Sequence, residues 1–286
     1  MILKNTFLTA TFSTKGAELI SLKTDTEKEL IWQADPKFWN KSSPILFPIV
    51  GGLKNNRYSY EEKFYELNRH GFARDLEFTV AYHFDEEICF ELKSTEDTKT
   101  LYPFDFILHI IYSLIHNELL CTYKVINPSK EVLYFSIGAH PAFALGETKE
   151  DFEKYTLHFY EDIELECQML DNGLIGNETR TIVLKNKALP LTYDIFYEDA
   201  LVIKNLKSSK LFIRNQADTS EIEFSFDDFP YFGIWSAKDA NFICLEPWCG
   251  IADSINHNHD LTEKEGIVAL ASQQMFERNW KIKYKE

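Results

Sequence analysis

Ile88-Cys89-Phe90-Glu91-Leu92-Lys93 alternates apolar and charged side chains with a period of two residues. In an extended strand, Ile88, Phe90 and Leu92 point to one side and the charged residues point to the other. One side of such a strand faces a core and the other faces water. The stretch therefore predicts a half-buried β-strand of the kind found in antiparallel sheets.

The same alternation recurs along the whole chain. It is clearest at residues 221–226 and 280–285, and further β-rich stretches cover residues 76–82, 133–137, 155–160, 201–204, 211–214 and 242–245. Residues 106–126 are apolar for too long to form one strand, and His116-Asn117-Glu118 interrupts them, which predicts two strands joined by a tight turn. Residues 207–210, Lys-Ser-Ser-Lys, predict another hairpin connection.

Helical periodicity is nearly absent from the sequence. Only residues 35–39 and 193–196 suggest short helical turns. Aromatic residues make up 15% of the chain, which also favours pleated structure. Many short strands with few helices predict an all-β fold, an antiparallel sandwich or barrel. With no linker-like tract or repeat, we expect residues 1–286 to form one domain.

The formal net charge of −15, from 30 basic and 45 acidic residues, argues against binding to nucleic acid or to an anionic membrane surface. No run of 18 apolar residues occurs, and the N-terminus lacks the pattern of a signal peptide. The five cysteines form an odd set without a CxxC pair. They predict reduced, mostly buried thiols in a cytoplasmic protein.

His140 lies in Gly138-Ala139-His140-Pro141-Ala142-Phe143, directly after an expected strand. Pro141 biases His140 toward an extended backbone. An imidazole held in this way is expected to titrate near neutrality, where it can give or take a proton. The alternative is a structural histidine bonded to a nearby carbonyl group.

Glu246 follows the apolar run 241–245, at the expected end of a strand, and Pro247 and Trp248 come next. If the carboxyl group is buried, its pKa should rise, as a general base that works near neutral pH requires. The alternative is a solvated glutamate at the end of the strand.

Arg69-His70-Gly71-Phe72-Ala73-Arg74-Asp75 is a third unusual stretch. His70 and Arg74 could donate hydrogen bonds to hydroxyl or phosphate oxygens. The alternative is a loop in which Arg74 pairs with Asp75 or with another surface carboxylate.

Two further patterns carry little weight. His257-Asn258-His259 has the spacing of metal ligands, but a third ligand is not evident, so a polar loop is the better reading. Gly51-Gly52 follows an apolar run without the GxGxxG spacing of a dinucleotide site.

Four stretches, taken in order, resemble the aldose 1-epimerase (galactose mutarotase) superfamily, and in particular its LacX-like branch near the glucose-6-phosphate 1-epimerase-like proteins. They are residues 44–51 (Pro-Ile-Leu-Phe-Pro-Ile-Val-Gly), 70–74 (His-Gly-Phe-Ala-Arg), 138–143 (Gly-Ala-His-Pro-Ala-Phe) and 244–248 (Cys-Leu-Glu-Pro-Trp). The resemblance implies a large antiparallel β-supersandwich with a sugar cleft on one face.

The resemblance also implies a role for each matching residue. His140 falls on the general acid that protonates the ring oxygen of the sugar, and Glu246 on the general base that takes the proton from the anomeric hydroxyl. His70 falls on a sugar-binding histidine, Asp199 matches the sugar-binding aspartate more loosely, and Arg74 is a further candidate for substrate binding. The expected reaction interconverts the α and β anomers of a hexose or hexose phosphate and needs no metal or organic cofactor.

One position departs from the family pattern. Related sequences commonly carry Gly-Arg where this chain has Gly51-Gly52, so the arginine expected to contact the sugar is missing; Arg57, Arg74 or Lys54 could replace it. The departure motivates a second hypothesis, a non-catalytic carbohydrate-binding or sugar-sensing protein. A third is a domain of a larger glycan-processing enzyme. The identity of the sugar, its phosphorylation and the oligomeric state stay open.

Overall fold

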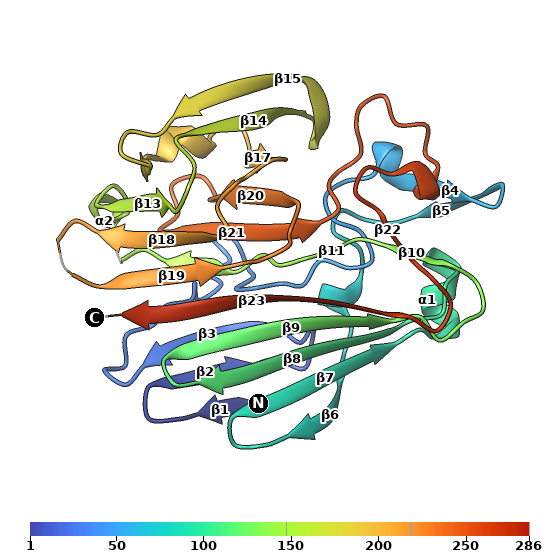
Figure 1. Cartoon of the computed structure of the whole chain (residues 1–286), viewed down its shortest axis with the longest axis horizontal. Helices are drawn as coiled ribbons and strands as arrows, with labels where there is room; N and C mark the ends of the chain where they lie inside the picture. Colours follow the sequence, from blue (N-terminus) through green and yellow to red (C-terminus); the bar gives the residue numbers. More distant parts are fainter. Residues whose placement is uncertain (147, 218, 286) are drawn as a thin grey trace.

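The computed structural model describes residues 1–146, 148–217 and 219–285, and antiparallel sheets dominate it (Figure 1). The largest sheet has nine strands, in the order β16 (Ala188–Pro190), β13 (Tyr155–Phe159), β18 (Lys210–Asn215), β19 (Glu221–Ser225), β23 (Met275–Lys285), β9 (Glu118–Ile126), β8 (Ile107–Ile115), β7 (Glu87–Lys93) and β6 (Thr79–His83). Its central strand β23 pairs with β19 on one side and with β9 on the other.

A second sheet has seven strands. Its order is β11 (Ile137–Gly138), β21 (Phe242–Cys249), β20 (Tyr231–Trp235), β17 (Leu201–Ile203), β14 (Glu164–Asp171) and β15 (Leu174–Val183), and β12 (Ala142–Ala144) also pairs with β21. Smaller sheets are formed by β1 (Ile2–Lys4), β2 (Leu8–Phe12) and β3 (Leu19–Thr24), by β4 (Arg57–Tyr60) and β5 (Lys63–Glu66), and by β10 (Leu133–Phe135) and β22 (Val268–Leu270).

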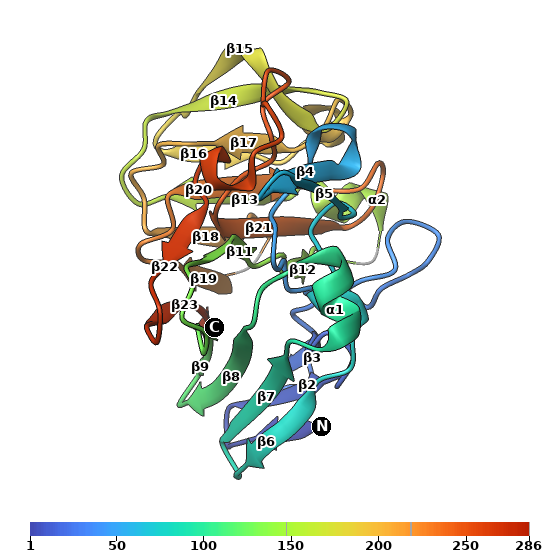
Figure 2. The same cartoon turned by 90° about the vertical axis from the view of Figure 1, so that its right-hand side faces the viewer.

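The nine-stranded sheet extends from β6 at the bottom of the molecule into its upper half, below β14 and β15, and each half packs against a different partner (Figure 2). In one half, Phe12 of β2 packs on Phe90 of β7 and Tyr112 of β8, with ring centroids 6.0 and 4.4 Å apart. In the other half, Phe143 of β12 packs on Phe224 of β19 at 5.5 Å. One main core extends from Leu3 to Tyr284. This is the antiparallel β-supersandwich that the sequence predicts.

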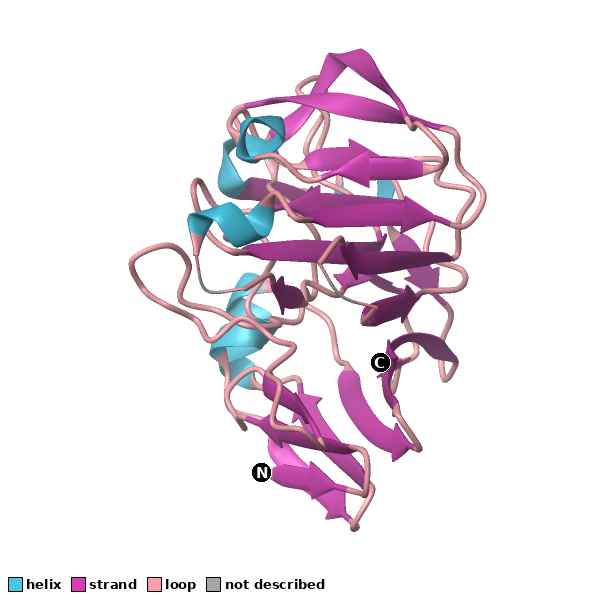
Figure 3. Ribbon diagram, turned by 90° about the vertical axis from the view of Figure 1, so that its left-hand side faces the viewer, coloured by secondary structure: helices cyan, strands magenta, loops and turns pink. Residues whose placement is uncertain are grey.

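Helices are few and short (cyan in Figure 3). They are α1 (Glu96–Leu101) and α2 (Lys149–Phe152), with 3-10 turns η1 (Lys54–Asn56), η2 (Ala73–Asp75), η3 (Tyr193–Phe196) and η4 (Leu261–Glu263). The turns expected at 193–196 and 35–39 are confirmed; in the latter, Phe38 N and Trp39 N both donate to Asp35 O. The sequence analysis missed α1 and α2, which are too short for a helical apolar stripe to develop.

The expected strands are present, with the turn at His116 between β8 and β9. The hairpin predicted at residues 207–210 is wrong, because β17 and β18 belong to different sheets. This connection crosses between the sheets, where the buried Asp162 carboxylate accepts hydrogen bonds from Lys207 N and Ser208 N. Its polar composition therefore serves a crossover between sheets, in which Ser208 is buried and Lys207 and Ser209 are exposed, and not a hairpin turn.

The five cysteines are buried and form no disulfide, as the sequence predicts. None of the helices in the described part of the chain has the length and apolarity needed to cross a membrane.

Candidate active site

Glu246 owes its position to the alternation of β21, a central strand of the seven-stranded sheet. Ile243, Leu245 and Cys249 belong to the main core. Glu246 and Trp248 therefore point to the opposite face of the sheet. The sequence analysis placed Glu246 at the end of a strand, and this is wrong: β21 continues to Cys249 because β20 pairs with it on one side as far as Trp248.

His140 faces Glu246 because the two residues lie opposite each other on the other side of β21. There, β11 pairs Gly138 with Trp248, and β12 pairs Ala142 with Cys244, so the same register places position 140 opposite position 246. Between the two short strands, Ala139 N donates to Pro247 O and Leu245 N donates to Pro141 O, while the two prolines have no N–H group to return these bonds. The pairing therefore holds His140 opposite the middle of β21.

The four stretches that carry the family resemblance meet around this point. Leu46 forms a bridge with Gly138, and Phe47 forms a parallel bridge with Gly71. Gly71 has a φ of +70°, and a Cβ atom there would lie 2.3 Å from Phe47 O. Only glycine fits this turn, which carries the neighbouring His70 toward His140, with the two ring centroids 5.8 Å apart.

A cavity of about 360 Å³ opens above the seven-stranded sheet at this junction. Its lining includes all five candidate residues from the sequence analysis, namely His70, Arg74, His140, Asp199 and Glu246. Three tryptophans, Trp39, Trp235 and Trp248, also line it. The cavity thus combines ring faces with a small set of convergent polar groups, as ligand sites usually do.

The two proposed catalytic groups touch each other. His140 Nε2 lies 3.1 Å from Glu246 Oε2, and the residues are only 7% and 2% exposed. Trp39 stacks on the imidazole with ring centroids 4.9 Å apart, and Trp235 meets it edge-on at 5.8 Å. The orientation of the imidazole is therefore fixed by the packing of the two tryptophans and by the contact with Glu246.

Burial disfavours charge on both groups. It raises the pKa of Glu246 well above its ordinary value, and it lowers the pKa of His140 to about 3. The expectation that His140 titrates near neutrality is therefore wrong for this structure, because desolvation penalises the imidazolium. At a pH above the pKa of His140 and below the pKa of Glu246, the pair carries one proton, and burial favours its placement on Glu246.

The His70 ring lies between two N–H groups. The N–H group of Gly51 is directed at Nδ1, 3.1 Å away, and Arg69 Nε is directed at Nε2, 3.3 Å away. Burial lowers the pKa of His70 well below its usual value, and a neutral imidazole has only one acceptor nitrogen. With Nδ1 accepting from the backbone, the proton of His70 is on Nε2, beside Arg69.

For Arg74 the sequence offered two interpretations, a hydrogen-bond donor to a ligand or a partner of Asp75, and the structure is compatible with both. Arg74 lines the cavity, and its Nε also lies 3.7 Å from Asp75 Oδ2. Its Nη2 donates to Arg69 O at 2.8 Å, which ties the two ends of the 69–75 turn together. Asp199 precedes β17, and its carboxylate accepts from Ala200 N at 2.7 Å.

Of the residues that could replace the arginine missing at position 52, Arg57 and Lys54 point elsewhere. Arg57 stacks over the Phe64 ring at 4.9 Å, and Lys54 Nζ donates to His257 O at 3.0 Å. Arg69, which the sequence analysis did not single out, lines the cavity. Its position next to His70 in the sequence could have indicated that Arg69 belongs to the site.

Trp39 and Trp235 were also missed, since Trp39 lies far in sequence from the other site residues and Trp235 belongs to β20, the strand paired with β21. No spacing rule connects them to His140. Only the packing of the 32–39 loop against β20 and β21, seen in the contacts of Trp39 with Trp235 and Phe242, brings them to the cavity.

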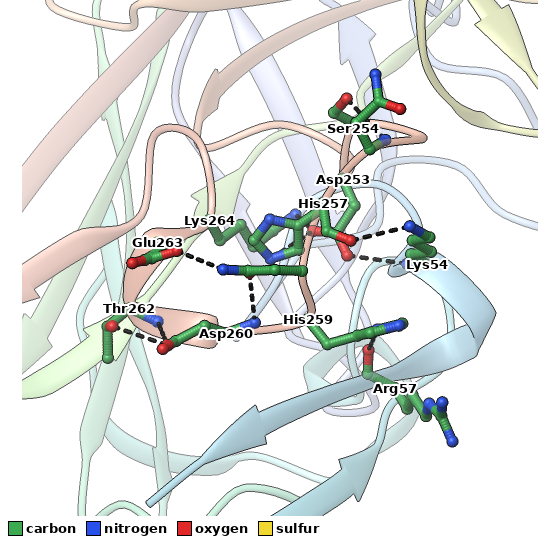
Figure 4. Close-up of polar contacts among 12 residues, drawn as sticks. Lys54, Arg57, Asp253, Ser254, His257, His259, Asp260, Thr262, Glu263 and Lys264 are labelled. Carbon is green, nitrogen blue, oxygen red and sulfur yellow. Dashed lines mark hydrogen bonds and ion pairs between the residues drawn. The ribbon is translucent and has the colours of Figure 1, made fainter. Parts of the chain in front are cut away.

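One wall of the cavity is anchored by a buried ion pair (Figure 4). Asp253 Oδ1 and Lys264 Nζ are 2.7 Å apart, and both side chains are fully buried. Asp253 Oδ2 also accepts from Lys54 N, and the backbone of Asp253 bonds to Gly52 O and Ile175 N. Asp253 thereby joins three segments that line the cavity or adjoin its lining.

The same view shows the two histidines with metal-like spacing (Figure 4). His257 Nε2 lies 3.9 Å from Asp253 Oδ1, and His259 Nδ1 lies 3.3 Å from Arg57 O. Each ring is thus occupied by a different neighbour in a polar loop.

Another group of side chains could hold a metal ion, namely His140, Cys244 and Glu246, whose ligand atoms lie within 4.8 Å of one another. Burial, and then the neighbouring Glu246, raise the pKa of the Cys244 thiol. Metals bind the thiolate. A cation would therefore have to displace the Cys244 proton and separate His140 from Glu246, whose Nε2 and Oε2 atoms are 3.1 Å apart.

Comparison with known proteins places this site in a family. The family model for aldose 1-epimerase matches residues 1–274. The plasmid-encoded protein LacX of Lactococcus lactis subsp. lactis is 34% identical over 279 residues, which cover 94% of this chain and 93% of LacX.

Solved structures agree with this assignment. A galactose mutarotase related enzyme from Lactobacillus acidophilus is 33% identical with a TM-score of 0.93, and covers 100% of this chain and 97% of its own. A galactose mutarotase-like protein from Lactobacillus casei is 28% identical with a TM-score of 0.92, and the match covers 100% and 99% of the two chains. The chain belongs to the aldose 1-epimerase family.

Proposed function

We propose that this protein is an aldose 1-epimerase that interconverts the α and β anomers of a hexose or hexose phosphate. The observation that carries the proposal is the contact between His140 and Glu246, 3.1 Å apart in a cavity walled by tryptophans. A proton donor and a proton acceptor next to aromatic faces suit the opening of a pyranose ring. In this proposal His140 and Glu246 are the catalytic residues.

The reaction requires two proton transfers. Glu246, ionised, takes the proton of the anomeric hydroxyl, while His140, protonated, gives a proton to the ring oxygen as the C1–O5 bond breaks. After rotation about the C1–C2 bond, the freed hydroxyl attacks the other face of the aldehyde. His140 then recovers its proton from that hydroxyl, and Glu246 returns its proton to O1.

One proton per pair is enough for this cycle. With the proton on His140 the pair can open the ring, and with the proton on Glu246 it can close the ring. Burial favours the second arrangement in the free protein. A bound sugar must therefore separate the two groups and favour the ionised arrangement through its own hydroxyl groups.

The remaining candidates would bind the sugar. His70 offers its Nε2–H, Arg74 offers guanidinium donors, and Asp199 offers a carboxylate acceptor at the same cavity. The tryptophan faces would stack on the C–H faces of the ring. The proposed chemistry uses only side chains and substrate, without a metal or organic cofactor. Five free, buried cysteines support a cytoplasmic location.

Anomer exchange measured by NMR tests the proposal, with galactose, glucose and their 6-phosphates as substrates. His140→Ala and Glu246→Gln should each lower kcat by about 10² to 10⁴, the usual contribution of a positioned acid or base. His116→Ala, at an exposed histidine, is the matched control and should leave the rate unchanged. Unchanged exchange in both site variants would refute the assignment.

A non-catalytic carbohydrate-binding or sugar-sensing role is the second candidate, and Gly52 favours it. Without a side chain at position 52, the site lacks one expected contact to the sugar. This role predicts a saturable NMR shift of cavity signals by sugar, with anomer exchange no faster than in buffer. Accelerated exchange of any bound sugar excludes it.

A further inference from the structure

Two N–H groups are directed at the His70 ring beside the cavity: Gly51 N at Nδ1, 3.1 Å away, and Arg69 Nε at Nε2, 3.3 Å away. A neutral imidazole has one acceptor nitrogen, so only one of these N–H groups can be satisfied by the ring. The Gly51 N–H belongs to the backbone, whereas the Arg69 side chain can turn, so we assign the acceptor to Nδ1 and the His70 proton to Nε2. A ligand oxygen that accepts from Arg69 Nε and from His70 Nε2–H would satisfy both donors.

Arg69 is also without a balancing carboxylate. No ion pair within 4.0 Å joins it to an acid in residues 1–146, 148–217 or 219–285, whereas Arg74 has Asp75 at 3.7 Å. The charge of Arg69 is nevertheless felt at the catalytic pair, since it lowers the pKa of both Glu246 and His140. Arg69 therefore places an unneutralised guanidinium close to the reacting groups.

The guanidinium lies against the turn between β14 and β15. A Cβ atom built on Gly173 would come within 2.9 Å of Arg69 Nη1. A Cβ atom on Gly52 would lie 3.6 Å from Gly173 O, an ordinary contact. Position 52 and the Arg69 guanidinium thus approach the same glycine, and a Cβ atom at position 52 would make ordinary contacts with Gly173 O and Leu174 Cδ2, both at 3.6 Å.

We infer that Arg69 is a substrate-binding residue that, together with His70, holds two oxygens on neighbouring carbons of the sugar. The planar fork of Arg69 offers parallel N–H donors, and His70 Nε2–H adds a third donor next to them. Two adjacent hydroxyl oxygens fit this arrangement of donors. The inference rests on the proposed function, and it makes Arg69 the group that takes up the task left open at Gly52.

The steady-state prediction is a rise in KM with little change in kcat. Arg69 contacts oxygens that do not react, so the sugar and its transition state should lose the same binding. Hydrogen bonds to charged groups contribute enough for Arg69→Gln to raise KM by about 10- to 100-fold. Arg69→Lys keeps the charge, so its KM should lie between that of the wild type and that of Arg69→Gln.

Anomer exchange by NMR gives both constants, and calorimetry on Glu246→Gln with and without Arg69→Gln gives sugar affinity directly. Arg57→Gln is the matched control, because Arg57 stacks on an exposed phenylalanine outside the cavity. Thermal unfolding of each variant identifies any loss of fold.

Gly52→Arg added to Arg69→Gln should lower KM again by at least tenfold relative to Arg69→Gln alone, since both positions approach Gly173. A KM unchanged in Arg69→Gln, or raised equally in Arg57→Gln, would overturn the inference. If KM stays as high in the double variant as in Arg69→Gln, the inference that Arg69 takes up the task left open at Gly52 is overturned. If the wild type binds sugar without exchange, the proposed function fails, and the calorimetric loss in Arg69→Gln still decides the role of Arg69.

Discussion

Lys264→Met should destabilise the protein strongly, although the two side chains are similar in length. The ammonium group of Lys264 is fully buried 2.7 Å from Asp253 Oδ1 (Figure 4). Methionine fills the volume but leaves the buried Asp253 carboxylate without its counter-charge. Removing one partner of a buried ion pair typically costs about 3 to 5 kcal/mol of unfolding free energy.

The expected change in melting temperature follows from the length of the chain. An unfolding entropy of about 2.1 cal/mol/K per residue gives about 0.6 kcal/mol/K for 286 residues. Dividing the energetic cost by this entropy predicts that Tm falls by about 5 to 8 °C. Differential scanning calorimetry and urea unfolding of the purified variant would measure both quantities.

Two controls separate the ion pair from a general effect of losing a lysine. Lys130→Met, in an exposed turn, should change the unfolding free energy by less than about 0.5 kcal/mol. Asp253→Asn combined with Lys264→Met should recover part of the loss, because no buried charge then remains. If Lys264→Met is as stable as Lys130→Met, the buried pair does not anchor this wall.

Three further predictions follow from the catalytic pair and its surroundings. Because burial lowers the pKa of His140 to about 3 and raises that of Glu246, kcat/KM from NMR exchange should not fall between pH 7 and pH 5; a decline near pH 6.5 would contradict this. A raised carboxyl pKa stabilises the fold below the unfolded-state pKa of about 4.5, and this contribution is lost as the pH rises through the folded-state value. Glu246→Gln should therefore be more stable than the wild type at pH 8 and lose that advantage at pH 4, as followed by urea unfolding. Gly138→Ala would bring a Cβ atom within 2.5 Å of Trp248 Cδ1 and should cost about 1 to 3 kcal/mol in urea unfolding, whereas Gly52→Ala, whose Cβ atom would make ordinary contacts at 3.6 Å, should be nearly neutral; equal costs would argue against the close packing of the indole.

The fold class was accessible from the sequence because period-two alternation records which face of each strand is buried. Residues 88–93 and 280–285 alternate in the sequence and lie in β7 and β23 of the large sheet. The pairing partners were not accessible. Residues 207–210 have the composition of a hairpin turn, yet they cross between two sheets, because Asp162 satisfies their backbone from a distant part of the chain.

The candidate site was accessible in part. The motifs pointed to His70, Arg74, His140, Asp199 and Glu246, and all five line one cavity, although their roles remain predictions. The missing information concerned neighbours far apart in sequence, which no local pattern encodes. Trp39 against His140 is one such case, and Arg69 above Gly173 is another.

By itself, the sequence determined the β architecture and the identity of the groups that can give or take a proton. Tertiary structure decided how readily each of those groups ionises. His140 and Glu246 are 106 positions apart in sequence, and they face each other because β11 and β12 pair with β21 in one register that places position 140 opposite position 246. Burial there disfavours the charged form of both side chains, because a desolvated pair is more stable when neutral.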